Sequence, residues 1–122
     1  MNRFAIGFGC IVAATALAPA PGRTETVEEN YRLYCVQCHG MAGTGQGVNQ
    51  TAGGLAVSAR DHTSAEQMAK LTDDEIRLAI AKGGDAVQKS ELMPPWGDVL
   101  AAKDIDDLVA YLRKLCKCAA AK

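Results

Sequence analysis

The stretch from Tyr34 to Gly43, "YCVQCHGMAG", places two cysteines three positions apart and a histidine directly after the second. On a helix, Cys35, Cys38 and His39 stand at i, i+3 and i+4, so their side chains emerge on one face. Three kinds of site use such a pattern: a redox-active dithiol, one half of a zinc site, and a covalent attachment point for haem. The rest of the chain decides among them.

The size and charge of the chain restrict its function. At 122 residues it holds at most one domain and an export segment. Its 13 basic and 14 acidic residues nearly cancel, which gives no electrostatic basis for binding nucleic acid or an anionic membrane surface. We therefore expect no nucleic-acid partner, and any protein partner must be recognised through local patches.

The N-terminal residues have the pattern of a secretory signal. Arg3 precedes an uncharged run from residue 4 to residue 18, and small residues and prolines follow in "APAPGR". The run is shorter than the ~18 residues that a membrane-spanning helix needs. We predict a signal peptide over residues 1–22, with cleavage after Ala16 or Gly22, and a mature domain over residues 23–122. The mature domain is expected in the periplasm without a membrane span, unless the leader is retained as an anchor.

Helix-start signals recur along the mature domain. Three threonine–glutamate pairs have the spacing of a capping box, namely Thr26/Glu29, Thr63/Glu66 and Thr72/Glu75. With the apolar stripe of the last segment, they predict helices at about 26 to 37, 63 to 70, 72 to 82 and 103 to 116. Loops rich in glycine or proline separate these helices at 40–54 and 83–98. No strand-like alternation occurs, so we predict an all-α fold.

Haem attachment accounts for the cysteine motif better than its two rivals. A thioredoxin-like dithiol belongs to a βαβ framework, and no strands are predicted. Zinc would need a second ligand pair, for which only His62 and the pair Cys116 and Cys118 remain. Two thiols can instead form thioethers with a porphyrin while the imidazole reaches its iron. We predict one covalently attached haem c per chain, with His39 as an iron ligand.

Four features of the chain resemble class I c-type cytochromes of bacterial type. These are the Cys35-x-x-Cys38-His39 motif, the glycine-rich loop after it, "LMPPWG", and the closing helix "DIDDLVAYLRKL". The likeness covers essentially the whole chain after the leader. It implies the cytochrome c fold wrapped around one haem, and one-electron transfer between periplasmic or membrane-associated redox proteins. It also implies Met93 as the second axial ligand, and contact between Tyr111 of the last helix and Tyr31 of the first.

The chain departs from this family at two places. Val27 stands eight residues before the first cysteine, where the family commonly has glycine at a helix crossing. The family also often has a proline after the histidine, whose carbonyl accepts the imidazole N–H. No proline occurs between Gly40 and Met93, so the sequence does not name the acceptor for His39.

The residues themselves also favour Met93 as a ligand. A thioether is a soft ligand that stabilises Fe(II), and Pro94-Pro95 stiffens the loop that carries it. The rival axial ligand is His62, in the polar segment "ARDHTS". Trp96 is a candidate for a propionate hydrogen bond or for packing on the porphyrin edge, and Arg60 is a candidate propionate partner by charge.

Three functions remain open at this stage. Ligation of iron by both His39 and Met93 predicts an electron carrier rather than an enzyme. A labile methionine would instead suit a sensor of small ligands, and a vacant distal side would suit a haem enzyme. Cys116 and Cys118 are left without a function, since Cys-x-Cys can bind a soft metal, link two chains or close an internal ring.

Overall fold

The computed structural model describes residues 25–121, so the predicted signal peptide lies outside the described residues. Within that range every regular element is a helix, which confirms the all-α prediction. None of these helices is long and apolar enough to span a bilayer. In chain order they are α1 (Val27–Tyr34), α2 (Val36–His39), α3 (Val48–Thr51), α4 (Ala65–Met68), α5 (Asp73–Lys82), the 3-10 helix η1 (Asp85–Val87) and α6 (Ala102–Cys116).

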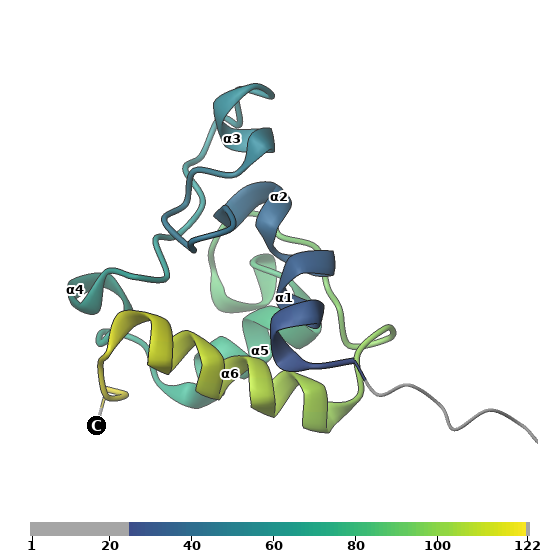
Figure 1. The fold of residues 1–122 in the computed structure, drawn as a ribbon, viewed down its shortest axis with the longest axis vertical. Helices are drawn as coiled ribbons and strands as arrows, with labels where there is room; N and C mark the ends of the chain where they lie inside the picture. Colours follow the sequence, from purple (N-terminus) through teal and green to yellow (C-terminus); the bar gives the residue numbers. More distant parts are fainter. Residues whose placement is uncertain (1–24, 122) are drawn as a thin grey trace, which may run out of the picture.

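The longest helix, α6, organises the fold by packing against α1, α4 and α5 (Figure 1). The predicted contact between the terminal helices is confirmed, because the rings of Tyr31 and Tyr111 have centroids 5.2 Å apart. Leu108 and Leu112 of α6 are buried together with Tyr31. Val27, at the position where the family commonly has glycine, is partly buried against this core.

Two of the three predicted capping boxes form, and they begin α1 and α5. The Thr26 hydroxyl accepts from the backbone N–H of Glu29 at 3.2 Å, and the Glu29 carboxylate accepts from the backbone N–H of Thr26 at 2.8 Å. Thr72 and Glu75 repeat this exchange at 3.1 and 2.7 Å. At its other end α5 stops before Gly83, whose φ of 87° lies in the region that glycine adopts most easily.

The third predicted capping box is wrong. Thr63 does not cap α4, because its hydroxyl donates to the carboxylate of Asp61 at 2.6 Å. Ser64 is the cap instead, accepting from the backbone N–H of Gln67 at 3.3 Å. The helix consequently covers only Ala65–Met68 rather than residues 63 to 70.

The predicted boundaries differ in three other places. The expected continuous first helix, 26 to 37, is interrupted at Cys35, and the chain turns there into α2. The glycine-rich loop contains the short helix α3, which packs against α2 at one end of the fold (Figure 1). The second loop contains the turn of η1. Glycine composition alone gave no sign of either short helix.

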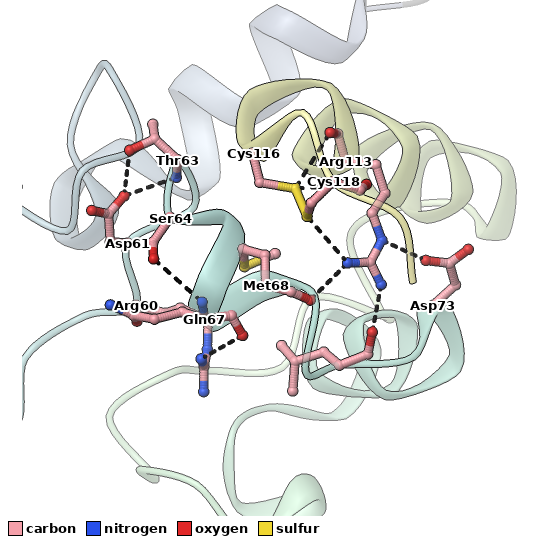
Figure 2. The surroundings of a disulfide bond; sticks show 11 residues. Arg60, Asp61, Thr63, Ser64, Gln67, Met68, Asp73, Arg113, Cys116 and Cys118 are labelled. Carbon is pink, nitrogen blue, oxygen red and sulfur yellow. Dashed lines mark hydrogen bonds and ion pairs between the residues drawn. A yellow bond between two sulfur atoms is a disulfide. The ribbon is translucent and has the colours of Figure 1, made fainter. Parts of the chain in front are cut away.

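The C-terminal cysteines form a disulfide with each other, at an S–S distance of 2.08 Å (Figure 2). Of the three possibilities that the sequence left open, this arrangement corresponds to a closed internal ring. Cys116 is buried with the core residues of α6, and Cys118 is joined to it rather than free.

Candidate cofactor site

The predicted attachment residues lie at the junction of α1 and α2. Cys35 ends α1, and its carbonyl accepts from the backbone N–H of His39 at 2.9 Å, which keeps the motif helical. Cys35, Cys38, His39 and Met93 all line one cavity of about 1000 Å³. The structure thus brings together the two thiols, the imidazole and the thioether that the sequence singled out.

The Cys35 thiol differs from the attacking thiol of a redox-active dithiol. Burial, with the neighbouring Cys38 as a smaller cause, raises the pKa of Cys35 to about 12. A redox dithiol needs a thiolate stabilised near neutral pH, so its attacking cysteine has a lowered pKa. Neither cysteine is in a disulfide. This environment does not suit thiol exchange at Cys35, and it leaves both sulfurs free for thioether formation.

The missing acceptor for His39 is the backbone carbonyl of Arg60. Nδ1–H of His39 donates to this oxygen at 2.9 Å, which leaves Nε2 as the nitrogen with a free lone pair. Burial lowers the pKa of His39, so the imidazole is neutral, as a metal ligand must be. Sequence reasoning missed this contact because every residue carries a carbonyl and nothing in the side chain marks it. The Arg60 guanidinium, proposed from charge for a propionate, donates to the Gln67 carbonyl at 3.4 Å and lines the cavity.

His62, the rival axial ligand, lies beside His39. Its ring is stacked on the His39 ring with centroids 4.0 Å apart, and its Nδ1 is 3.0 Å from the Tyr31 hydroxyl. The side chain is only 7% exposed, and burial, then the nearby His39 and Arg60, lowers its pKa well below the usual value. Two imidazoles on opposite faces of one iron point end-on at the metal and do not stack. His62 is thus buried, although it stands in the polar segment that leads to the Ser64 cap of α4.

The loop that carries Met93 is attached to the C-terminal end of α5. The Met93 carbonyl accepts from Gly84 N–H at 3.0 Å, and Trp96 N–H donates to the Ile80 carbonyl at 2.9 Å. The Trp96 contact satisfies one of the backbone carbonyls that the end of α5 leaves without a partner in the helix. A Cβ on Gly84 would lie 2.2 Å from the Ser90 carbonyl oxygen, so the loop can approach this closely only because residue 84 is glycine.

Trp96 lies in the wall of the same cavity. Its ring packs on Tyr34 of α1, with centroids 5.1 Å apart and planes tilted by 51°. The aromatic pair joins the Met93 loop to the helix that precedes the cysteines. Packing of Trp96 on the porphyrin edge and a propionate hydrogen bond both stay predictions.

The sequence profile of the family described as "Cytochrome C oxidase, cbb3-type, subunit III" matches residues 22–112. The chain belongs to this family of c-type cytochromes. Its cofactor is accordingly haem c, bound covalently, and its function is haem-based electron transfer. The donor set fits this cofactor, because two thiols and a neutral imidazole with its Nδ1 fixed face one cavity.

Solved c-type cytochromes have the same fold. "KustC0563 c-type cytochrome" is 28% identical, with a TM-score of 0.58 over 72% of this cytochrome and 94% of that chain. A mutant of Kustc0563, solved separately, is 27% identical, with a TM-score of 0.57 over 73% and 96% of the two chains. A chain of the "Kuenenia stuttgartiensis reducing HAO-like protein complex Kustc0457/Kustc0458" shares the fold at 24% identity, with a TM-score of 0.55 over 78% of this cytochrome and 44% of that chain. No curated protein sequence matches significantly.

Proposed function

We propose that this cytochrome is a one-electron carrier whose haem c is attached through Cys35 and Cys38, with His39 and Met93 as the axial ligands. The observation that carries the proposal is that these four side chains line one cavity. Bound haem c supplies Fe(III)/Fe(II) exchange. The residues of the chain hold the group, set its environment and exclude other ligands.

The surroundings of His39 and Met93 support this ligand pair. The Arg60 carbonyl fixes His39 with Nε2 as its free nitrogen. The stacked His62 is held by Tyr31 on the same side as His39, which leaves Met93 as the candidate for the other face. Met68, another methionine of the cavity wall, is only 1% exposed and belongs to the apolar core. Met41 is 67% exposed and does not line the cavity.

Two protein ligands leave no position for a substrate, so we propose electron transfer without enzymatic activity. The partners would be a donor and an acceptor redox protein, met through a small and weak docking interface of the kind that electron carriers use. We further propose that residues 1–22 direct export and that the protein works in the periplasm. A sensor with a labile methionine, or a haem enzyme, would require an axial position that opens readily.

Replacing Met93 tests the ligand assignment. In the oxidised spectrum of the haem-loaded protein, Met93→Ala should abolish the thioether–iron band near the red end and lower the reduction potential. Met41→Ala is the matched control, and it should leave both unchanged. Unchanged absorption and potential in Met93→Ala would overturn the assignment of Met93.

Carbon monoxide separates the carrier from the sensor and the enzyme. The reduced protein should bind carbon monoxide slowly or not at all at neutral pH, whereas Met93→Ala should bind it rapidly. Rapid binding by the unaltered protein would favour a labile methionine.

The intact mass of the mature protein tests haem attachment and leader cleavage together. It should equal that of a polypeptide that begins after the leader plus one haem.

A further inference from the structure

The disulfide between Cys116 and Cys118 is poorly placed to stabilise the fold. It encloses a single residue, Lys117, at the C-terminal end of α6. The stabilisation from a cross-link grows with the length of the loop that it closes, so this ring constrains the unfolded chain very little. It also joins no two separate elements. Stabilisation of the fold therefore does not explain this disulfide.

A fixed positive charge faces one sulfur of the pair. Nη1 of Arg113 lies 3.8 Å from Sγ of Cys118 (Figure 2). The guanidinium is held there by three further acceptors, which are the Asp73 carboxylate at 2.8 Å, the Met68 carbonyl at 2.7 Å and the Leu71 carbonyl at 2.6 Å. Asp73 offsets part of the charge. A cation beside a cysteine stabilises its thiolate form.

The other sulfur has surroundings that suit a protonated thiol. Cys116 is 4% exposed, and its Sγ lies 3.3 Å from the Arg113 carbonyl oxygen and 3.9 Å from the Cys118 carbonyl oxygen. These oxygens would accept from an S–H group, which a disulfide sulfur lacks. The site therefore offers a partner to each sulfur of the reduced pair, a cation for Cys118 and carbonyl oxygens for Cys116.

We propose that Cys116 and Cys118 form a thiol–disulfide exchange site, which takes two electrons from thiol donors. A donor thiolate attacks Sγ of Cys118, the more exposed sulfur, and the S–S bond breaks with Cys116 leaving and taking up a proton. A second donor thiol attacks the donor sulfur of the mixed disulfide and releases Cys118 as a thiolate facing Arg113. Two donor thiols become one donor disulfide, and the protein disulfide becomes a dithiol.

The exchange site is separate from haem attachment but adjoins the cofactor cavity. Met68 and Leu71, whose carbonyls hold Arg113, also line that cavity. The backbone N–H of Ala121 donates to the same Leu71 carbonyl at 3.1 Å, so the tail beyond the disulfide is attached to a residue that lines the cavity. A two-electron thiol couple would then sit next to the one-electron centre of the same domain.

Redox titration of the haem-loaded protein tests the exchange. The protein is equilibrated with graded mixtures of reduced and oxidised glutathione, quenched in acid, labelled with a maleimide and weighed intact. We expect two labels per chain to appear within the glutathione series, because Cys35 and Cys38 are consumed as thioethers. Labels that appear only with excess dithiothreitol would show a structural disulfide and overturn the proposal. Two labels before any reductant, or a disulfide-linked dimer, would overturn it as well.

Single-cysteine variants test the roles of the two sulfurs. In Cys116→Ser the remaining Cys118 should react with iodoacetamide at least about tenfold faster than Cys116 does in Cys118→Ser, because Cys118 is the less buried of the two and faces a cation. Equal rates would contradict the asymmetry. Haem absorption and far-ultraviolet circular dichroism confirm that both variants are folded.

Charge variants in the Cys116→Ser background test Arg113. Arg113→Gln should slow alkylation about tenfold, Arg113→Lys should restore part of the rate, and the exposed Lys114→Gln should change it less than about twofold. Equal effects of Arg113→Gln and Lys114→Gln would contradict the local role of Arg113. If Arg113→Gln does not fold, Asp73→Asn provides the test, because removing the competing carboxylate should speed alkylation. Slower or unchanged alkylation in Asp73→Asn would count against the proposal.

Discussion

Tyr31 and His62 form a polar pair inside an apolar core. Both are almost fully buried, and the Tyr31 hydroxyl lies 3.0 Å from Nδ1 of His62. Burial raises the pKa of Tyr31 and lowers that of His62, so both groups stay neutral over the ordinary pH range. A neutral buried pair is stable only while each partner satisfies the other. The stacking of His62 on His39 then makes Tyr31 an indirect support of the proposed iron ligand.

Removing the hydroxyl of Tyr31 should destabilise the protein. Tyr31→Phe leaves Nδ1 of His62 without its partner, and we expect the free energy of unfolding to fall by about 1–3 kcal/mol. Denaturant titration of the haem-loaded protein measures this change. Tyr34→Phe is the matched control, because the Tyr34 hydroxyl has no hydrogen bond among the described residues and its ring packing on Trp96 is kept. Equal stabilities of the two variants would contradict the role of the pair.

Not all of the site could be foreseen from residue types. The cysteines, His39 and Met93 are marked by their chemistry and spacing, and the structure places them around one cavity. The Arg60 carbonyl carries no side-chain signal, and His62 stands among polar neighbours although it is buried. These two contacts come from tertiary packing, which local sequence patterns do not encode.

At the level of elements, α5 begins at a capping box and ends against the loop that carries the proposed ligand Met93. Its N-terminus is closed by Thr72 and Glu75, and its C-terminal carbonyls accept from the loop that carries Met93. The Thr72 box was predictable because both partners lie within one turn. The same spacing at Thr63 failed, because Asp61 competes for the hydroxyl. A local pattern predicts an element correctly only when no neighbouring group binds the capping side chain.

Substitution of Gly84 should disturb the Met93 loop. The Cβ of Gly84→Ala would lie 2.2 Å from the Ser90 carbonyl oxygen and 3.3 Å from the Met93 Cβ, so the backbone must shift. We expect a loss of about 1–3 kcal/mol in unfolding free energy, together with weakening of the thioether–iron band. Gly54→Asn is the control, since nothing lies within 4 Å and asparagine tolerates its φ of 61°. A normal band in Gly84→Ala would show that the loop does not depend on this close approach.

The capping box of α5 should make stability depend on pH. Hydrogen bonds from the backbone N–H and then the hydroxyl of Thr72 lower the pKa of Glu75 below its ordinary 4.5. The stabilisation is therefore present above pH 4.5 and lost as the pH falls through the lowered pKa. Glu75→Gln keeps an acceptor but removes the charge, so it should destabilise the protein at neutral pH and much less in acid. Thermal unfolding at several pH values measures this, with the exposed Glu91→Gln as a control that should show no such difference.

At the scale of the whole molecule, the apolar core borders the cofactor cavity. Ten buried hydrophobic side chains, mostly from α5 and α6, form the core that the described residues provide. The cavity of about 1000 Å³ borders several of them, including Met68, Ile80 and Leu108. A domain of this size has little stability to spare. The covalently attached cofactor is therefore expected to contribute a large part of the apolar interior.

Preventing attachment should accordingly unfold the domain. The double variant Cys35→Ser with Cys38→Ser cannot form thioethers, and we expect it to lose most of its helical circular dichroism and its cooperative thermal transition. The matched control is Cys116→Ser with Cys118→Ser, which makes the same chemical change away from the attachment site and removes a ring that constrains the unfolded chain little. It should keep the haem absorption and a cooperative transition. If the Cys35/Cys38 variant unfolded as cooperatively as the control, the protein interior alone would determine the fold, and the cofactor would serve electron transfer without supporting the structure.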